Sequence, residues 1–387
     1  MRRSLAALLA VATLCLTASD AGAQKDRKVP KRPPLFEGAD TNSWFAYYQA
    51  GLQNLRRRPE LADADFYWAA RLNPTVPEPL YASWVAFWKR QREERFWDYM
   101  EGKRFVVEAK DVQAADSLRF MALRRNPMMY QGLWIELFDD PNNGLNMSLD
   151  PGIQGMVAYA QGNPRKAAER LGVAVKDKSN RGLRYDRALA LFQIAQYDSA
   201  AHELQLLLDD MRKRDEKKLV RAYESKQMYE YAIGVLMAMK GDTTAAREAY
   251  GRALTEDLSF APAHLQLSFV ADAMGDSATA IQELEQATEL DSTDIAAHYQ
   301  LGTHYLMKGK TEEAKAHLRK AIALEPYYAP PYYPLAYILE YEENNAEAAA
   351  NYAAFAARAP AADARVAVAR QKAEELAKKA APSGGGQ

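Results

Sequence analysis

The sequence predicts an all-α protein, a superhelical solenoid of antiparallel helical hairpins with no β-sheet. The main observation is a 34-residue period in two columns of small residues: Ala246, Ala280, Ala314 and Ala348 in one, and Ala253, Ala287 and Ala321, followed by Phe355, in the other. A column of glycines has the same period and is broken by Glu343 in the last unit: Gly241, Gly275 and Gly309. A fixed period of this length indicates stacked hairpins, each of which packs on its neighbours.

The most regular unit runs from Ile295 to Tyr328. Its first part has the spacing of an amphipathic helix, and Gly309 to Thr311 form a tight turn. Glu312 to Leu324 are predicted to form a second helix, which ends before Pro326. Alanine recurs where two helices cross because only a Cβ fits between them, and glycine recurs where the turn favours a positive φ.

Composition excludes several classes of protein. The 387 residues carry a net charge of −1, so no global field attracts nucleic acid to the chain. Mean hydropathy is negative, which argues against an integral membrane protein. After the first residues, no segment approaches the roughly 18 uninterrupted apolar residues that a membrane-spanning helix needs.

The N-terminus has the three parts of a signal peptide. Arg2 and Arg3 form a positive region, residues 5–16 are apolar, and an A-x-A site ends at Ala23. We expect cleavage after Ala23 and a periplasmic or secreted protein. Because Cys15 is the only cysteine, the mature chain is expected to have neither disulfides nor thiol chemistry.

The rest of the chain divides by composition and by the strictness of the repeat. The expected units are a basic, proline-containing linker (24–41), an aromatic-rich divergent helical region (42–147), weaker repeats (148–214), an array whose period is strict from residue 227 (215–362), a capping helix (363–380) and a disordered tail (381–387).

The divergent region is expected to be helical. Ser43 can cap a helix that runs to Arg58, and Leu80 to Arg90 begin a further hairpin. Separate helices are expected at Glu94–Met100 and Ala114–Arg125. All six tryptophans lie between Trp44 and Trp134, which indicates either a bulkier core or a different task for this region.

These units resemble the tetratricopeptide repeat family. The unit from Ile295 to Tyr328 carries most of the family signature, with His298 in place of the usual Trp and Leu318 in place of the usual Phe: Leu301-Gly302, Tyr305, Ala314 and Pro326. The units near Gln227, Ala261 and Ala329 match less fully. The units near Ser43, Ser148 and Arg181 match weakly. The resemblance implies a right-handed superhelix and, in most members, a protein-binding scaffold without enzymatic activity.

In this family the first helix of each hairpin lines the concave surface. Carried over, this implies a tyrosine-rich groove for a peptide or protein partner: Tyr231, Val235, Phe269, Tyr299, Thr303, Leu306, Tyr333, Tyr337 and Tyr341. The Lys, Arg and Asn residues of the family's carboxylate clamp are missing from this face, so no such clamp is expected. The alternative that these tyrosines only fill the space between repeats remains open.

Two other functions remain open. Glycan binding by tryptophan and tyrosine stacking is one, and the tryptophan-rich region favours it. The other is an enzyme with an unrecognised site in residues 91–147, although no HExxH, G-x-S-x-G, P-loop or GxGxxG motif is present.

No metal or cofactor is expected. His264 and His298 occupy equivalent places in adjacent repeats, about 10 Å apart, and are interpreted as packing residues. Residues 139–150 have the length of a calcium loop, but Pro141 stands where a ligand is needed. The identity of the partner and the oligomeric state remain open.

Overall fold

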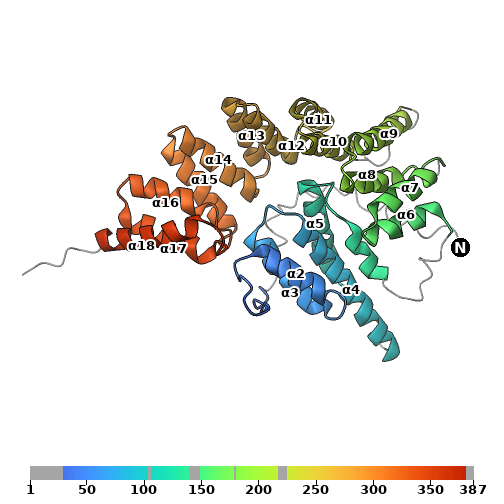
Figure 1. Ribbon diagram of the computed structural model, residues 1–387, viewed down its shortest axis with the longest axis horizontal. Helices are drawn as coiled ribbons and strands as arrows, with labels where there is room; N and C mark the ends of the chain where they lie inside the picture. Colours follow the sequence, from blue (N-terminus) through green and yellow to red (C-terminus); the bar gives the residue numbers. More distant parts are fainter. Residues whose placement is uncertain (1–28, 103–105, 139–148, 178–179, 217–224, 381–387) are drawn as a thin grey trace, which may run out of the picture.

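The computed structural model describes residues 29–102, 106–138, 149–177, 180–216 and 225–380. Within these ranges the regular structure is helical, without a strand, and the predicted all-α solenoid is confirmed (Figure 1). The predicted signal peptide, the tail 381–387, residues 24–28 of the basic linker and most of the calcium-like loop lie outside the described residues.

Successive helices pair as antiparallel hairpins that stack into an arc (Figure 1). Their bounds are α2 (Trp44–Asn54), α3 (Pro59–Leu72), α4 (Glu78–Met100), α5 (Ala109–Arg125), the 3-10 helix η2 (Gly132–Phe138), α6 (Pro151–Ala160), α7 (Pro164–Ala174), α8 (Leu183–Gln193), α9 (Tyr197–Asp215), α10 (Lys226–Lys240), α11 (Thr243–Glu256), α12 (Ala261–Ala273), α13 (Ser277–Leu290), α14 (Ile295–Met307), α15 (Thr311–Leu324), α16 (Tyr332–Tyr341), α17 (Asn345–Arg358) and α18 (Arg365–Ala380).

The turn column holds residues in left-handed conformation, as the glycine pattern predicts. Gly241, Gly275 and Gly309 have φ of 86°, 77° and 73°, and Glu343 has φ of 60° in the last unit. Asp242 then caps α11, since its carboxylate accepts a hydrogen bond from the Ala245 amide. Each turn therefore reverses the chain within a few residues and starts the next helix.

The helices of the N-terminal region differ from the expected bounds. Glu78 to Met100 form one 23-residue helix, where two helices were expected. No glycine or proline interrupts residues 90–96, which are mostly Arg, Glu and Gln, so nothing there ends the helix. In addition, α2 ends at Asn54, before Arg58, and α5 begins at Ala109.

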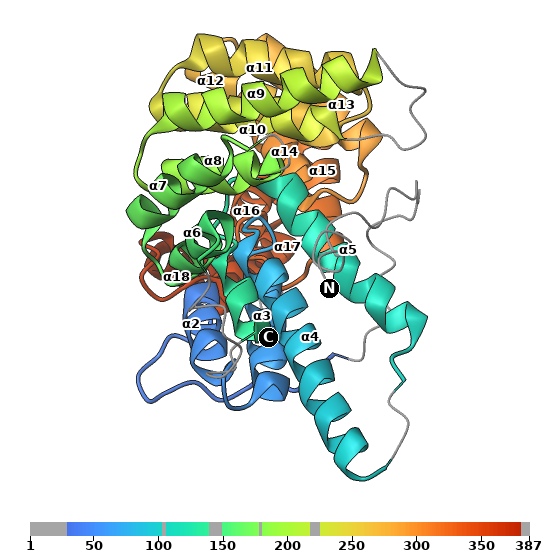
Figure 2. The ribbon, with the colours of Figure 1, turned by 90° about the vertical axis from the view of Figure 1, so that its right-hand side faces the viewer.

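The N-terminal hairpin α2–α3 lies against the C-terminal repeats, more than 250 residues away in sequence. Asn42 donates from its amide to the carbonyls of Ala357 (2.9 Å) and Ala359 (3.2 Å). The Ala361 amide donates to the Asp40 carboxylate at 2.8 Å. The two ends of the arc are thereby joined, and the C-terminal part of α4 extends away from the other helices (Figures 1 and 2).

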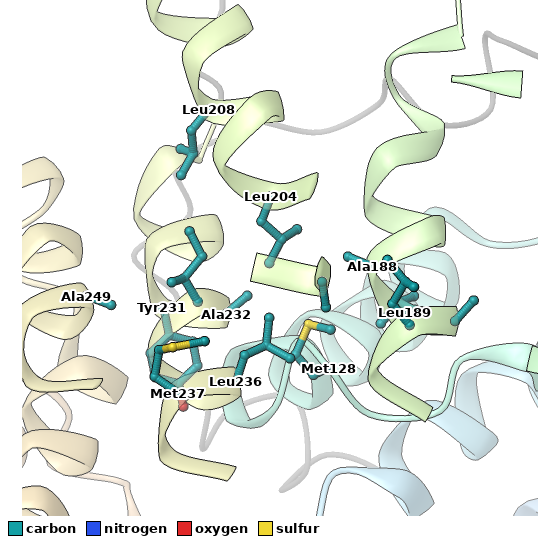
Figure 3. Close-up of a cluster of buried hydrophobic side chains, with 14 of the residues drawn as sticks. Met128, Ala188, Leu189, Leu204, Leu208, Tyr231, Ala232, Leu236, Met237 and Ala249 are labelled. Atoms are coloured by element: carbon teal, nitrogen blue, oxygen red, sulfur yellow. The ribbon is translucent and has the colours of Figure 1, made fainter. Parts of the chain in front are cut away.

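The chain crosses its own concave side between α5 and η2. We call residues Arg125–Gln131 the crossing segment. Its Met128 is buried in the hydrophobic core that α8, α9 and α10 form, where it lies among Leu189, Leu204 and Leu236 (Figure 3). Its Met129 is buried in a separate core around α3 and α4. The crossing segment therefore contributes a buried side chain to each of two hydrophobic cores and joins them.

Two helical glycines form a matched test of hairpin packing. A Cβ at Gly234 would lie 2.3 Å from the Tyr250 ring, whereas a Cβ at Gly251 would meet nothing within 4 Å. We expect Gly234→Ala to lower the free energy of unfolding by about 1–3 kcal/mol through overpacking. We expect Gly251→Ala to raise it by up to about 1 kcal/mol through helix propensity. Urea unfolding measures both, and equal effects would contradict the packing described.

Candidate functional site

The concave face is formed by the first helices of the hairpins. From α10 onward these helices repeat every 34 residues, so equivalent side chains form rows one helical turn apart. The rows are Tyr231, Leu265, Tyr299 and Tyr333; then Val235, Phe269, Thr303 and Tyr337; then Met239, Ala273, Met307 and Tyr341. Every residue of the predicted groove except Leu306 belongs to the first two rows or to the last position of the third.

The crossing segment covers the first part of this face. Four tyrosine hydroxyls from α4, α6, α8 and α10 hydrogen-bond its main chain: Tyr231 to the Arg125 carbonyl (3.0 Å), Tyr185 to the Pro127 carbonyl, Tyr81 to the Gln131 carbonyl (2.7 Å), and Tyr159 with the Gln131 amide (3.3 Å). These bonds satisfy buried main-chain groups that would otherwise lose their hydrogen bonds to water.

Tyr231 is therefore buried, whereas the sequence predicts it in an open groove. It is 1% exposed, because the crossing segment and the core around α10 enclose its ring and hydroxyl. Burial raises the pKa of all four tyrosines, so their hydroxyls remain protonated and able to donate. Burial also raises the pKa of Asp186, beside this cluster, to about 7. Val235 is half-buried against the same core.

Beyond Tyr231 the concave face opens into a cavity of about 640 Å³. One wall is the first turns of α12 and α14, with Leu265 and Tyr299. The opposite wall comes from α3 and α5, including Arg71 and Arg124, and the turn that holds Glu325 closes one side. This volume lies within the range of about 300–1,000 Å³ typical of ligand sites.

Four side chains link α3 to the turn after α15, and two of them, Arg71 and Glu325, also line the cavity. We call the four the clasp: Trp68, Arg71, Glu325 and Tyr327. Arg71 Nε and Nη2 donate to the two Glu325 carboxylate oxygens at 2.8 and 2.9 Å. The Arg71 guanidinium lies over the Tyr327 ring at 4.8 Å, and Trp68 meets that ring edge-on at 5.0 Å. Burial lowers the pKa of Arg71, but Glu325 more than offsets this, so the net pKa is raised.

The far side of the concave face remains exposed to solvent. Five large apolar side chains there are between 37% and 80% exposed, and we call them the open row: Met239, Phe269, Met307, Tyr337 and Tyr341. They come from four successive first helices, so the row continues along the array. Exposed apolar side chains that recur on successive helices are typical of an interaction surface.

The other predicted groove residues are half-buried. Thr303 donates its hydroxyl to the Gln300 carbonyl at 2.7 Å. The Tyr299 ring packs edge-on against Tyr328, and Tyr333 packs against Tyr352 and Phe355. Leu306 packs against the core of the last repeats. Met307 was not among the predicted site residues, although its 34-residue spacing from Tyr341 could have identified it.

The tryptophans serve mainly as packing residues. Trp68 is buried and its indole nitrogen donates to the Pro30 carbonyl at 3.1 Å. The Trp84 indole nitrogen donates to Asp116 at 3.2 Å. Trp97, on α4, is 63% exposed. The tryptophan-rich region therefore gives less support to a stacking surface for glycans than its composition indicates.

Within the described residues, no three His, Cys, Asp or Glu side chains come together as a metal site. No described helix is long and apolar enough to cross a membrane.

Two equivalent histidines have different partners. His264 Nδ1 lies 2.7 Å from the Glu283 carboxylate, whereas His298 Nδ1 lies 2.9 Å from His317 Nδ1. Burial lowers the pKa of His298, and burial together with the charge of His298 lowers the pKa of His317. Burial also lowers the pKa of His264, but its bond to Glu283 more than offsets this and the net pKa is raised. Other charged groups also act on the histidine pair: Glu285, Asp291, Asp294 and Lys320.

The histidine pair gives a prediction for pH dependence. Because His298 and His317 have lowered pKa values in the folded state, the unfolded chain binds more protons, and stability falls as pH drops below about 6.5. In the variant His317→Glu, the new carboxylate is expected to raise the pKa of His298, as Glu283 does for His264. The new pair should then stabilise the fold at low pH and lose this effect as pH rises. Urea midpoints of the variant and the unmodified protein at pH 7.5 and 5.5 measure this, and the same change of midpoint with pH in both proteins would contradict it.

The clasp can be tested against an exposed ion pair. Arg71→Ala is expected to lower the free energy of unfolding by about 3–5 kcal/mol, because Glu325 stays buried without its cation. The control is Arg56→Ala, which removes a pair with Glu136 from a side chain that is 69% exposed, and should cost about 1 kcal/mol or less. Similar losses in the two variants would show that the clasp contributes no more than a surface pair.

A family model and several solved structures are similar to parts of this chain. Residues 273–333 match the family model of the tetratricopeptide repeat. YrrB, described as a TPR protein with an unusual peptide-binding site, is 19% identical; the match covers 53% of this chain and 100% of that chain with a TM-score of 0.41. PilF of Pseudomonas aeruginosa is 19% identical over 51% of this chain and 89% of that chain, with a TM-score of 0.40.

MamA of Desulfovibrio magneticus RS-1 is 19% identical over 46% of this chain and 97% of that chain, with a TM-score of 0.37. Likeness at these identities concerns the fold alone. No curated protein sequence matches the chain. The matched residues lie in the strict part of the 34-residue period, where each unit is a helical hairpin, and this part of the chain is similar to the tetratricopeptide repeat.

Proposed function

We propose that the chain is an exported scaffold without enzymatic activity, which binds a protein or peptide partner along the open row of its concave face. The observation that carries this proposal is the open row itself, in which four successive first helices present large apolar side chains to solvent from the second and third of their equivalent positions. Methionine and tyrosine suit such a surface, since methionine adapts its shape and tyrosine combines a rigid ring with a hydroxyl.

The proposed binding mode does not use a carboxylate clamp. The described first helices carry no cluster of Lys, Arg and Asn on the open row. Arginines that line the cavity together with Phe269 come from the N-terminal helices and already have partners. Arg71 pairs with Glu325, and the Arg124 guanidinium lies over the rings of Phe120 and Phe260. Contact area and hydrogen bonds from tyrosine therefore supply the affinity in this proposal.

Export is part of the proposal and rests on the sequence of residues 1–23. Intact mass spectrometry of the protein recovered from outside the cytoplasm should show a chain that begins at Gln24. A chain that begins at Met1 would contradict it.

The binding surface is tested by the double variant Tyr337→Ala with Tyr341→Ala. Both side chains are more than half exposed, so the fold should be unaffected, while the affinity for a partner should fall about tenfold or more. A photo-crosslinking residue at position 341 first identifies the partner, and one at position 290 on α13 serves as the control. Leu290 is exposed on a second helix of a hairpin, away from the open row.

The proposal predicts specific adducts at position 341, their absence at position 290, and weaker binding of the identified partner by the double variant. Equal adducts at the two positions, or unchanged affinity in the double variant, would place the partner elsewhere on the protein.

A further inference from the structure

We infer that a second cavity, which lies between two successive hairpins, binds a small organic acid with an apolar chain. We call it the side cavity, and its volume is about 450 Å³. Its walls include Arg165 and Glu169 of α7, Arg187 and Leu191 of α8, and Ile194 and Gln196 of the turn that follows α8. The inference goes beyond the proposed function, because the side cavity takes a small molecule and shares no residue with the open row.

The side cavity and the crossing segment lie on different sides of α8. Tyr185 of α8 binds the crossing segment through its hydroxyl, and Arg187 follows it by two residues. Since successive residues of an α-helix are about 100° apart, Arg187 projects from nearly the opposite side of α8. Leu191 stands one helical turn further along, on the same side as Arg187. The side cavity is therefore separate from the concave face, where a carboxylate clamp would lie.

Arg187 is held in place while several of its donors stay free. Its Nη1 donates to the carboxylate of Glu203, which is buried. The guanidinium lies against α7 at Gly172, where a Cβ would be 3.1 Å from its Cζ, Nε and Nη2. Among the described residues, no group accepts a hydrogen bond from Nε or Nη2 of Arg187. Because a guanidinium carries five N–H groups, those of Nη2 can bind an anion while Nη1 keeps its partner.

Positive charge exceeds negative charge around the side cavity. Arg184 and Arg187 share the single carboxylate of Glu203, and Arg184 Nη1 lies 2.6 Å from Oε2. Arg165 is exposed on the first turn of α7 and has no hydrogen bond or ion pair among the described residues. Glu169 is the acidic residue of the lining. Three arginines therefore stand against two glutamates, and this excess of positive charge favours an anion.

The cavity beside the clasp has no such excess. Its basic and acidic lining residues are equal in number: Arg71, Arg124 and Arg125 against Asp291, Asp294 and Glu325. Its charges therefore give no net attraction to an anion.

The rest of the side cavity suits the chain of an organic acid. Leu191 and Ile194 supply apolar surface, and the exposed Gln196 carries an amide that can donate to an anion oxygen. An inorganic ion would gain nothing from the apolar wall, whereas each methylene group of a ligand chain can lose its contact with water there. The carboxylate is then placed at Arg165 and Arg187, with the chain against Leu191 and Ile194. The volume lies within the range of about 300–1,000 Å³ typical of ligand sites.

The experiment uses hexanoate as the probe. It is titrated into the full chain at low salt, and binding is followed by ligand-observed NMR. Two comparison ligands separate the parts of the probe, since hexan-1-ol keeps the chain without the charge and acetate keeps the charge without the chain. We expect saturable binding of hexanoate and a Kd at least about tenfold higher for each comparison ligand.

Two variants place the binding site. Arg165→Gln removes a cation that has no partner among the described residues, so the fold should be unaffected while the Kd for hexanoate rises about tenfold. Arg187→Lys keeps the charge beside Glu203 but loses the planar guanidinium, and should weaken binding similarly. The matched control is Arg247→Gln, which removes an exposed arginine from α11 and should leave the Kd unchanged. Thermal unfolding confirms that each variant is folded.

The absence of saturable hexanoate binding would overturn the inference. So would hexan-1-ol that binds as tightly as hexanoate, or a Kd that Arg165→Gln changes no more than Arg247→Gln does. Crosslinks at position 341 report on the open row, so their presence or absence tests the proposed function separately.

Discussion

The arrangement depends on how the concave face of the solenoid is covered. A stack of helical hairpins buries the contacts between neighbours, but its inner face has no neighbour of its own. In this protein the crossing segment packs against the inner face of α8 and α10. Its buried main-chain groups lose their hydrogen bonds to water, and tyrosine hydroxyls replace those bonds. Without those hydroxyls, burial of Met128 and Met129 would leave unsatisfied carbonyls in the core.

This covering decides which part of the concave face can serve a partner. The crossing segment covers the concave face as far as Tyr231, which is buried. The clasp holds α3 against the turn at Glu325. Between them lies the cavity, and along the far edge lies the open row. The N-terminal helices therefore act on the binding surface in two ways. They remove part of it from solvent, and they add walls from α3 and α5 to what remains.

The sequence predicts those features of the structure that depend on contacts within a repeat unit or between adjacent units. The period places the turns at Gly241, Gly275 and Gly309 because the same local packing recurs in each unit. It also places Tyr337 and Tyr341 on the concave face, where both are exposed. The period could not predict the pairing of Arg71 with Glu325, because a repeat pattern specifies contacts between adjacent units only. For the same reason it assigned Tyr231 to an open groove, since nothing nearby in sequence indicates that residues 125–131 return to cover it.

The central claim is that the chain fills one part of its concave face and leaves the other part open. Methionine oxidation by dilute hydrogen peroxide, followed by peptide mass spectrometry, tests this directly, because oxidation rates follow solvent access. The account predicts fast oxidation of Met239 and Met307, which are exposed, and strong protection of Met128 and Met129, which are 1% and 2% exposed. Oxidation of Met128 and Met129 as fast as that of Met239 and Met307 in the folded protein would contradict it.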